Sequence, residues 1–386
     1  MEFRLTDEQS ALQAAARKYV QERLMPLAAQ IDREDSPPPR ALVREYAEMG
    51  FLGVNVRPEY GGLGLSNLDA LIVLEEFGKC SSALAFPVFE SCVGPVRSVE
   101  HFAGDALRKR VIPKVCSGEM IVAVSMSEPQ AGSALSDLST RGEIRSDRVV
   151  LNGTKRWCSG GGHADAYVVY CRMSGEPGAK GIGAVLVEKG TPGLSFGARE
   201  SLMGFRGVPS SDLYFDSCEV PVENIIVPAG GFRKLMETFD LERCGNATMS
   251  LSQASGALED ALAYVQERKQ FGKPLVDFQA VQLKLAEMQM KVEAARLLIW
   301  RAVATMSDGL PNVLDASVAK CFANEAAREV CGHAVQLMGG YGYSREYPME
   351  RRLRDAWGWG IAGGAIDIQK VNIASAMIGR RFDQRR

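Results

Sequence analysis

Four short stretches of this chain combine residue types that can bind an anion or a planar ligand. Residues 127–133 read SEPQAGS, residues 155–159 read KRWCS, residues 267–273 read ERKQFGK and residues 336–342 read QLMGGYG. A planar guanidinium such as that of Arg268 binds phosphate oxygens in pairs, and clustered glycines let backbone amides approach an anion. Taken singly, the stretches are more typical of a polar turn, a core tryptophan and a solvated helix end.

The candidate proton acceptor is Glu242, in the sequence FDLER at 239–243. We expect it in the first turn of a helix that begins near Phe239, where a glutamate is favourable through the helix macrodipole and usually solvated. The neighbouring Arg243 should keep the carboxylate ionised before a substrate binds, and burial beneath a substrate should raise its pKa. Without further context, the position favours a structural role.

The first third of the chain reads as helices. Thr6 and Gln9 fit a capping box at the start of a long helical stretch, which the prolines at 37–39 end. Further helices are predicted over 41–49, 67–77 and 104–115.

The middle of the chain changes character near residue 120. Short runs rich in β-formers predict strands at 121–125, 149–151, 166–171, 183–187 and 213–215. Asn152-Gly153 predicts a hairpin turn, because both turn positions need a positive φ.

Helical periodicity returns from about residue 231, with helices predicted over 278–305, 316–337 and 366–380. The order of helices, strands and helices predicts an α+β fold of segregated layers. We expect an N-terminal helical domain at 1–119, a β-barrel-like domain at 120–230 and a C-terminal four-helix bundle at 231–386.

Composition limits the classes of function. The chain has 386 residues and a formal net charge of −2, so nothing predicts a nucleic-acid surface. The three histidines are widely separated, and the nine cysteines include no C-x-x-C pair, so we expect reduced thiols and no metal site. No apolar run predicts a membrane span or a signal peptide, and we expect a cytoplasmic protein.

Together, the four stretches resemble the signatures of the acyl-CoA dehydrogenase family. They are similar to its Ser/Thr-Glu-Pro-x-x-Gly-Ser loop, its Trp-Ile-Thr segment, its E-R-x-x-F-G motif and its Gln-x-x-Gly-Gly-x-Gly motif. The first departs from the pattern at Ala134, where the family has Asp. The resemblance extends over essentially the whole chain.

This resemblance implies FAD as the cofactor, in a site shared by two subunits of a homo-oligomer, most often a tetramer. Arg268 would reach the pyrophosphate of FAD that a neighbouring subunit holds. The implied cofactor-binding residues are Met126, Ser127, Gly132, Ser133, Trp157, Cys158, Ser159, Arg268, Gln270, Phe271, Gln279, Gln336, Gly339, Gly340, Ala365 and Asp367.

Gly363 stands where most members of the family carry the glutamate that removes the substrate's α-proton. One branch, which includes isovaleryl-CoA dehydrogenase, carries that glutamate on an earlier helix instead, in Leu-Asp-Leu-Glu-Arg. The resemblance therefore implies Glu242 as the relocated base, with Arg243 beside it. The vacated corner would become part of a substrate pocket, for a cyclic or branched acyl group, lined by Phe86, Trp357, Trp359, Ala362 and Gly363.

The expected reaction is dehydrogenation of an acyl thioester, carried by CoA or by a carrier protein, with an electron-transfer flavoprotein or O₂ as the acceptor. Two alternatives remain. The chain could be a diverted member, an oxygenase or a desulfinase or other lyase, although residues 82–87 lack the arginine that desulfinases use. It could also be a non-catalytic flavoprotein scaffold.

Overall fold

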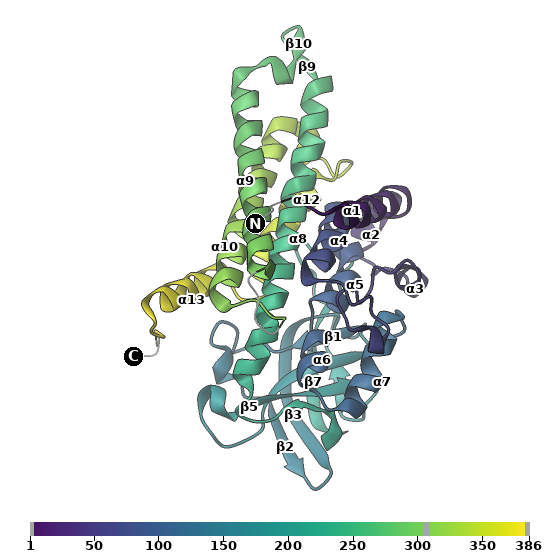
Figure 1. Cartoon of the computed structure of the whole chain (residues 1–386), viewed down its shortest axis with the longest axis vertical. Helices are drawn as coiled ribbons and strands as arrows, with labels where there is room; N and C mark the ends of the chain where they lie inside the picture. The colour runs from purple at the N-terminus through teal and green to yellow at the C-terminus, as the bar shows by residue number, and fades with distance from the viewer. Residues whose placement is uncertain (1–3, 305–308, 383–386) are drawn as a thin grey trace.

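The computed structural model describes residues 4–304 and 309–382. Helices come first, then a β-sheet region, then helices again (Figure 1). The long helix α8, Phe232–Glu267, extends from the sheet region toward the small β9–β10 hairpin at the opposite end of the molecule. The predicted α+β class and its order of layers are therefore confirmed.

The N-terminal region is built from α-helices, of which α1 and α5 pack against α4, and α6 packs against α7. The Thr6–Gln9 capping box is present, as predicted. The sequence analysis missed α5, which is mostly apolar and lacks an amphipathic period, and α6, which is only seven residues long. The helices are α1 (Asp7–Tyr19), α2 (Met25–Glu34), α3 (Arg40–Glu48), α4 (Asn67–Cys80), α5 (Ser82–Cys92), α6 (Val96–Phe102) and α7 (Asp105–Cys116).

The middle region is one mixed sheet of eight strands. Its order is β6-β7-β3-β2-β4-β5-β8, and β1 pairs in parallel with β4. The strands are β1 (Val122–Ser125), β2 (Arg141–Arg145), β3 (Arg148–Ser159), β4 (Ala166–Arg172), β5 (Ile182–Glu188), β6 (Leu194–Phe196), β7 (Ser210–Pro221) and β8 (Ile225–Val227).

The predicted hairpin at Asn152-Gly153 is wrong. Both residues lie inside β3, where the pairing with β7 shifts register next to Gly153. The Asn152 side chain accepts a hydrogen bond from the Ser217 amide at 2.8 Å, so it serves the bulge instead of a turn. The real β2–β3 turn is at 146–147, and Ser146 adopts the positive φ of 53° there.

Alternate residues of the central strands bury opposite faces of the sheet. Val168 and Tyr170 of β4 pack into a core that includes residues of α6 and α7. Tyr167 and Val169 of the same strand pack into a second core with residues of β3 and β7. The sheet is therefore covered by helices on one face and closed by its own strands on the other.

The C-terminal region is helical, and α10 packs against α8, α9, α12 and α13. Its helices after α8 are α9 (Gln279–Ala304), α10 (Val313–Met338), α11 (Gly340–Tyr343), α12 (Met349–Trp359) and α13 (Ile366–Ile378). The two-residue strands β9 (Lys269–Gln270) and β10 (Lys273–Pro274) form the hairpin between α8 and α9. Over the described ranges, no helix has the length and apolarity needed to cross a membrane.

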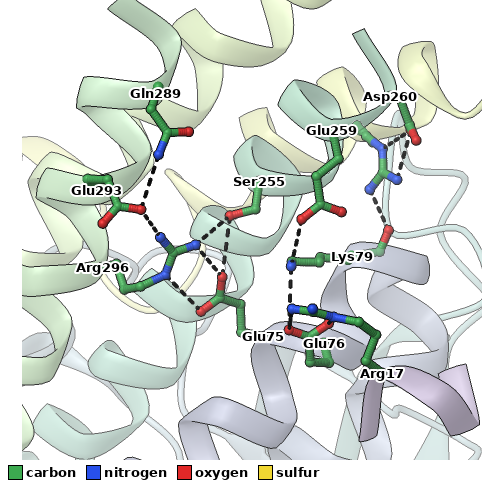
Figure 2. Close-up of polar contacts among 11 residues, drawn as sticks. Arg17, Glu75, Glu76, Lys79, Ser255, Glu259, Asp260, Gln289, Glu293 and Arg296 are labelled. Atoms are coloured by element: carbon green, nitrogen blue, oxygen red, sulfur yellow. Dashed lines mark hydrogen bonds and ion pairs between the residues drawn. The ribbon is translucent and has the colours of Figure 1, made fainter. Parts of the chain in front are cut away.

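Ion pairs join the N-terminal helices to the C-terminal bundle (Figure 2), and the carboxylate of Glu75 is buried in one of them. Glu75 of α4 accepts from Arg296 of α9 at 2.8 Å and from Ser255 of α8 at 3.3 Å. One turn further along α4, Lys79 pairs with Glu259 of α8 at 2.8 Å. Because a buried carboxylate such as that of Glu75 is stable only when it is paired, these contacts hold α4 against α8 and α9.

Candidate active site

Glu242 lies on α8 deeper in the helix than the sequence indicated. The helix begins at Phe232, so Glu242 is in its third turn and not in a first turn near Phe239, which is a correction. Glu242 is therefore too far from the start of α8 to be stabilised by the helix macrodipole, as a first-turn glutamate would be. Its side chain is half-buried.

Burial raises the pKa of Glu242 to about 8, although the positive charge of Arg243 acts to lower it. We expected Arg243 to keep this carboxylate ionised before a substrate binds, but its charge offsets the effect of burial only in part. Arg243 forms a buried ion pair with Asp240, one turn earlier on α8, and its guanidinium lies 5.1 Å from the centre of the Phe239 ring. The charge of Arg243 is therefore shared with Asp240, and Glu242 is poised near neutral pH, as a general base should be.

Gly363 follows α12 in a tight loop with Gly364, and both residues adopt a positive φ, of 66° and 89°. Asn246, one turn after Glu242 on α8, donates to the Ala362 carbonyl at 3.2 Å. A Cβ at Gly363 would lie 3.1 Å from the Asn246 amide nitrogen. The structure thus brings the Ala362–Gly363 loop against the same helix that carries Glu242, with little room there for a side chain.

Lys320 of α10 is a buried lysine beside this loop that the sequence analysis did not single out. Its ammonium donates to the Asn324 side-chain oxygen at 2.9 Å and to the Trp359 carbonyl at 3.3 Å. Burial, with help from the charge of Arg243, lowers the pKa of Lys320 to about 7. The lysine ties α10 to the end of α12 and so holds the loop that contains Gly363.

The two tryptophans of α12 have different surroundings. Trp359 is buried against Phe89 and Phe205, with ring centres 5.8 and 4.6 Å away. Trp357 is 47% exposed and stacks with the Arg328 guanidinium at 4.2 Å. Since residues two apart on a helix point to different sides, the two indoles do not lie side by side, and the small cavity at α5 is lined by neither of them.

The first group of predicted cofactor residues comes together where β1 meets β3. The Arg156 amide donates to the Ser127 carbonyl at 2.9 Å, and the Cys158 thiol donates to the Val124 carbonyl at 3.3 Å. This places Met126, Ser127, Gly132 and Ser133, on the loop after β1, beside Trp157, Cys158 and Ser159 on β3. Gly132 and Ser133 are exposed, with open space around Gly132.

Trp157 is unusual for a strand residue. It is 53% exposed and has a φ of 61°, at a register shift between β3 and β7. The bulge aims the indole out of the sheet, and the Arg156 guanidinium lies 4.2 Å from its ring centre. A large aromatic ring held outside the core by a strained backbone is typical of a ligand contact.

A buried ion pair fixes the loop after β1. Lys155 donates to Glu128 and to the Met126 carbonyl, both at 2.9 Å. Glu128 also accepts from the backbone amides of Ser139 and Thr140, at 2.6 and 2.8 Å. Burial alone would raise the pKa of Glu128, but the Lys155 charge and these hydrogen bonds lower it to about 2. Both residues lie within the quoted motifs, yet only the structure reveals that they act as a pair.

The second group of predicted cofactor residues lines an open groove of about 550 Å³ at the far end of the bundle. Arg268 contributes from the end of α8 and Gln270 from β9, and Gln336, Gly339 and Gly340 contribute from the end of α10 and the start of α11. Arg268 is exposed, 5.6 Å from the centre of the Tyr341 ring. Gly339 has a φ of 59°, and no atom lies within 4 Å of where a Cβ would stand on either glycine. The groove therefore offers a cation and accessible backbone, which suit a phosphate.

The remaining predicted cofactor residues lie outside these two groups of contacts. Phe271 is 93% exposed in the β9–β10 hairpin, and Gln279 is exposed at the start of α9. Ala365 and Asp367 stand at the start of α13, which packs against α10.

The two cofactor groups stand near opposite ends of α8 (Figure 1). Twenty-six residues of helix separate Glu242 from Arg268, which corresponds to about 39 Å at 1.5 Å per residue. The two groups of predicted cofactor residues are therefore far apart within one chain.

A small apolar cavity lies between α5 and the sheet region. Phe86, which the sequence assigned to the substrate pocket, lines it together with Pro87 and Glu90. Ala123 of β1, Gly160 and residues 207–209 close the opposite side. Glu90 was missed, because a single acidic residue in an apolar helix gives no sequence signal of its own.

Comparison with known proteins identifies the family. The chain matches the acyl-CoA dehydrogenase N-terminal domain over residues 6–119, the middle domain over 123–218 and the C-terminal domain over 229–378. A 3-sulfinopropanoyl-CoA desulfinase of Paraburkholderia xenovorans is 38% identical over 100% of this chain and 99% of its own. The mitochondrial isobutyryl-CoA dehydrogenase of Dictyostelium discoideum is 39% identical over 96% of this chain and 89% of its own.

Solved structures agree with this result. Butyryl-CoA dehydrogenase from Megasphaera elsdenii superposes with a TM-score of 0.94 at 33% identity, covering 98% of this chain and 100% of that one. An FAD complex of PigA superposes with a TM-score of 0.92 at 26% identity, over 98% and 99% of the two chains. The chain belongs to the acyl-CoA dehydrogenase family of oxidoreductases, which act on the CH–CH group of acyl-CoA, and its cofactor is FAD.

Proposed function

We propose that this protein is an FAD-dependent acyl-CoA dehydrogenase in which Glu242 removes the α-proton to give a 2-enoyl thioester. The observation that carries the proposal is the state of Glu242. It is half-buried on α8, and burial raises its pKa to about 8, while the family's usual base position is Gly363. A carboxyl with a pKa near the working pH is suited to take up a proton reversibly.

The groups that would hold FAD fit the cofactor. Arg268, Gly339 and Gly340 of one subunit would bind its phosphates, and Trp157 with the loop after β1 of another would border its ring. When bound, FAD supplies the acceptor for the hydride that leaves the β-carbon. The Lys155–Glu128 pair keeps the loop after β1 in place. As the α-proton passes to a Glu242 carboxylate oxygen and the hydride leaves the β-carbon, a double bond forms between these two carbons. The protein would act as a homo-oligomer, for which we propose a tetramer, with electron-transfer flavoprotein or O₂ as the acceptor.

The test compares Glu242→Gln with a matched control, Glu237→Gln. Glu237 lies on the same helix but pairs with Arg233 at its exposed end. Both variants should bind FAD and keep the visible flavin spectrum. With isobutyryl-CoA, butanoyl-CoA and cyclohexanecarbonyl-CoA as probes, Glu242→Gln should lose at least about 100-fold in kcat, the lower range for a lost general base. Full turnover in that variant with FAD bound would refute the assignment.

The desulfinase reaction is the second candidate, because one relative with 38% identity over the whole chain is a 3-sulfinopropanoyl-CoA desulfinase. The cavity argues against it here. The side chains that line it include the carboxyl of Glu90 but no lysine or arginine. Burial, aided by the nearby Arg40, lowers the pKa of His163, which favours its neutral imidazole form. Inside this cavity an anionic sulfinate would meet no lysine or arginine, so sulfite release from 3-sulfinopropanoyl-CoA should be undetectable.

A further inference from the structure

Glu90 is a buried carboxyl without a hydrogen-bond partner for one of its oxygens. It lies on α5, and only 5% of the residue is exposed. Its Oε2 atom finds no donor or acceptor among the described residues. A buried polar group normally has a partner, because an unmade hydrogen bond is costly. An orphaned carboxyl that lines a cavity therefore indicates that something else completes it.

The position of Glu90 places it beside the proposed chemistry. It lines the same cavity as Phe86 and Pro87 of α5 and Ala123 of β1. Glu242 on α8 is close enough for its charge to disfavour ionisation of Glu90 on α5, and the two helices pack closely where Gly245 of α8 meets Phe89 of α5. Glu90 also lies close enough to Cys158, one of the proposed flavin-facing residues, to influence the pKa of that thiol. An acyl group whose α-carbon lies at Glu242 and whose chain extends toward this cavity would reach the Glu90 carboxyl.

The surroundings of Glu90 favour its neutral form. Burial raises its pKa well above the ordinary value, and the nearby Glu242 raises it further. Among the described residues no cation acts against this: Arg243 is paired with Asp240, and burial lowers the pKa of His163, the other titratable group of the cavity. A protonated carboxyl at this position can both donate and accept a hydrogen bond.

We infer that Glu90 determines specificity by binding an oxygen substituent, a hydroxyl or a keto group, on the part of the acyl group beyond the β-carbon. The inference rests on the proposed dehydrogenase function and defines its substrate class. Purely hydrocarbon acyl groups would leave Glu90 unpaired, and acyl groups ending in an anion would be repelled by ionised Glu242. A site built around a buried hydrogen-bonding group discriminates strongly against ligands that lack the matching group.

The test uses matched pairs of thioesters. Pentanoyl-CoA is compared with 4-oxopentanoyl-CoA and 4-hydroxypentanoyl-CoA, and hexanoyl-CoA with 5-oxohexanoyl-CoA. 4-Aminobutanoyl-CoA and glutaryl-CoA serve as cationic and anionic probes. The loss of a hydrogen bond to a buried carboxyl corresponds to a preference of about 10- to 100-fold. We therefore expect the wild type to favour at least one oxygenated ester over its hydrocarbon partner by that factor in kcat/KM.

Two variants separate recognition from packing. Glu90→Gln keeps a donor and an acceptor and should retain the preference, whereas Glu90→Leu fills the same space without either and should abolish or invert it. The control is Ser91→Ala, because Ser91 faces away from the cavity and binds the Val88 carbonyl and the Gly53 amide. This control should keep the wild-type preference.

Binding is also measured by calorimetry in the Glu242→Gln background, which does not depend on turnover. An unchanged preference in Glu90→Leu, or a wild type that favours the hydrocarbon, cationic or anionic esters, would overturn the inference. Absence of turnover with every ester, alongside a Glu90-dependent binding preference, would contradict the dehydrogenase proposal and support the assignment of Glu90.

Discussion

The pH dependence of substrate turnover provides a quantitative check on Glu242. Burial raises the pKa of this carboxyl to about 8, and only the ionised form can accept a proton. The ionised fraction follows directly from that pKa: about 1% at pH 6, about 9% at pH 7 and about 50% at pH 8. Activity should therefore rise with pH across this range.

The assay is the pH profile of kcat/KM, because this quantity reports the pKa values of the free enzyme. We expect an increase of about ninefold from pH 6 to pH 7 and about fivefold from pH 7 to pH 8. The electrostatic contribution of the neighbour can be checked in Arg243→Gln. The Arg243 charge is what opposes the effect of burial, so its removal should move the midpoint of the profile to higher pH.

A profile that is flat or falling between pH 6 and pH 8 would refute this reasoning. A midpoint near 4.5 would show a solvated carboxylate and contradict the burial on which the argument depends. Arg233→Gln, at the exposed start of α8, serves as a control that removes a cation without affecting Glu242. Its profile should match that of the wild type.

Three further outcomes follow from the geometry. Lys155→Met leaves Glu128 buried without its cation, and should cost about 3 kcal/mol or more in the free energy of unfolding, measured by chemical denaturation, together with reduced FAD content. Arg268→Gln should weaken FAD retention by about 10- to 100-fold, as expected for a charge-assisted hydrogen bond, without lowering the melting temperature of the FAD-free protein. Gly363→Ala should destabilise the protein by about 1 kcal/mol, because φ is 66° and Asn246 lies close to the added Cβ, but should leave the pH profile unchanged; a shifted midpoint would contradict a passive role for this position.

The sequence predicted the helices and strands well where the signal is local. The capping box at Thr6 and the long helices α9 and α10 follow from side-chain chemistry and apolar periodicity. The Asn152-Gly153 turn was wrong because a positive φ is also needed at a β-bulge, and only pairing with β7 distinguishes the two. The apolar helix α5 gave no period, because it is buried on nearly all sides.

Candidate site residues were recognisable where a motif is contiguous, and not where the site depends on distant contacts. Resemblance pointed to Arg268, whose neighbours in the groove come from the end of α10. The protonation state of Glu242 could not be predicted, because it depends on burial and on the commitment of Arg243 to Asp240. Glu90 belongs to no sequence motif, and only the structure shows that one of its carboxyl oxygens is unpaired and that the residue lines an apolar cavity.

The separation of the two groups of predicted cofactor residues allows the proposed shared FAD site to be tested. About 39 Å of α8 separates Glu242 from Arg268, so under the proposed function each subunit would contribute phosphate contacts at one end and ring contacts at the other. Arg268→Gln and a Trp157→Ala variant should each lose FAD when pure, whereas mixing the two should restore some FAD binding if subunits exchange. Equal loss in the mixture and in the single variants would contradict a shared site.

The central claim is that Glu242 removes the α-proton, and exchange of that proton with solvent tests it most directly. Butanoyl-CoA is incubated with the FAD-loaded enzyme in D₂O without an electron acceptor, and deuterium at the α-carbon is followed by NMR. Wild type and Gly363→Ala should catalyse the exchange, and Glu242→Gln should not. Exchange that persists in Glu242→Gln at the wild-type rate would show that another group is the base.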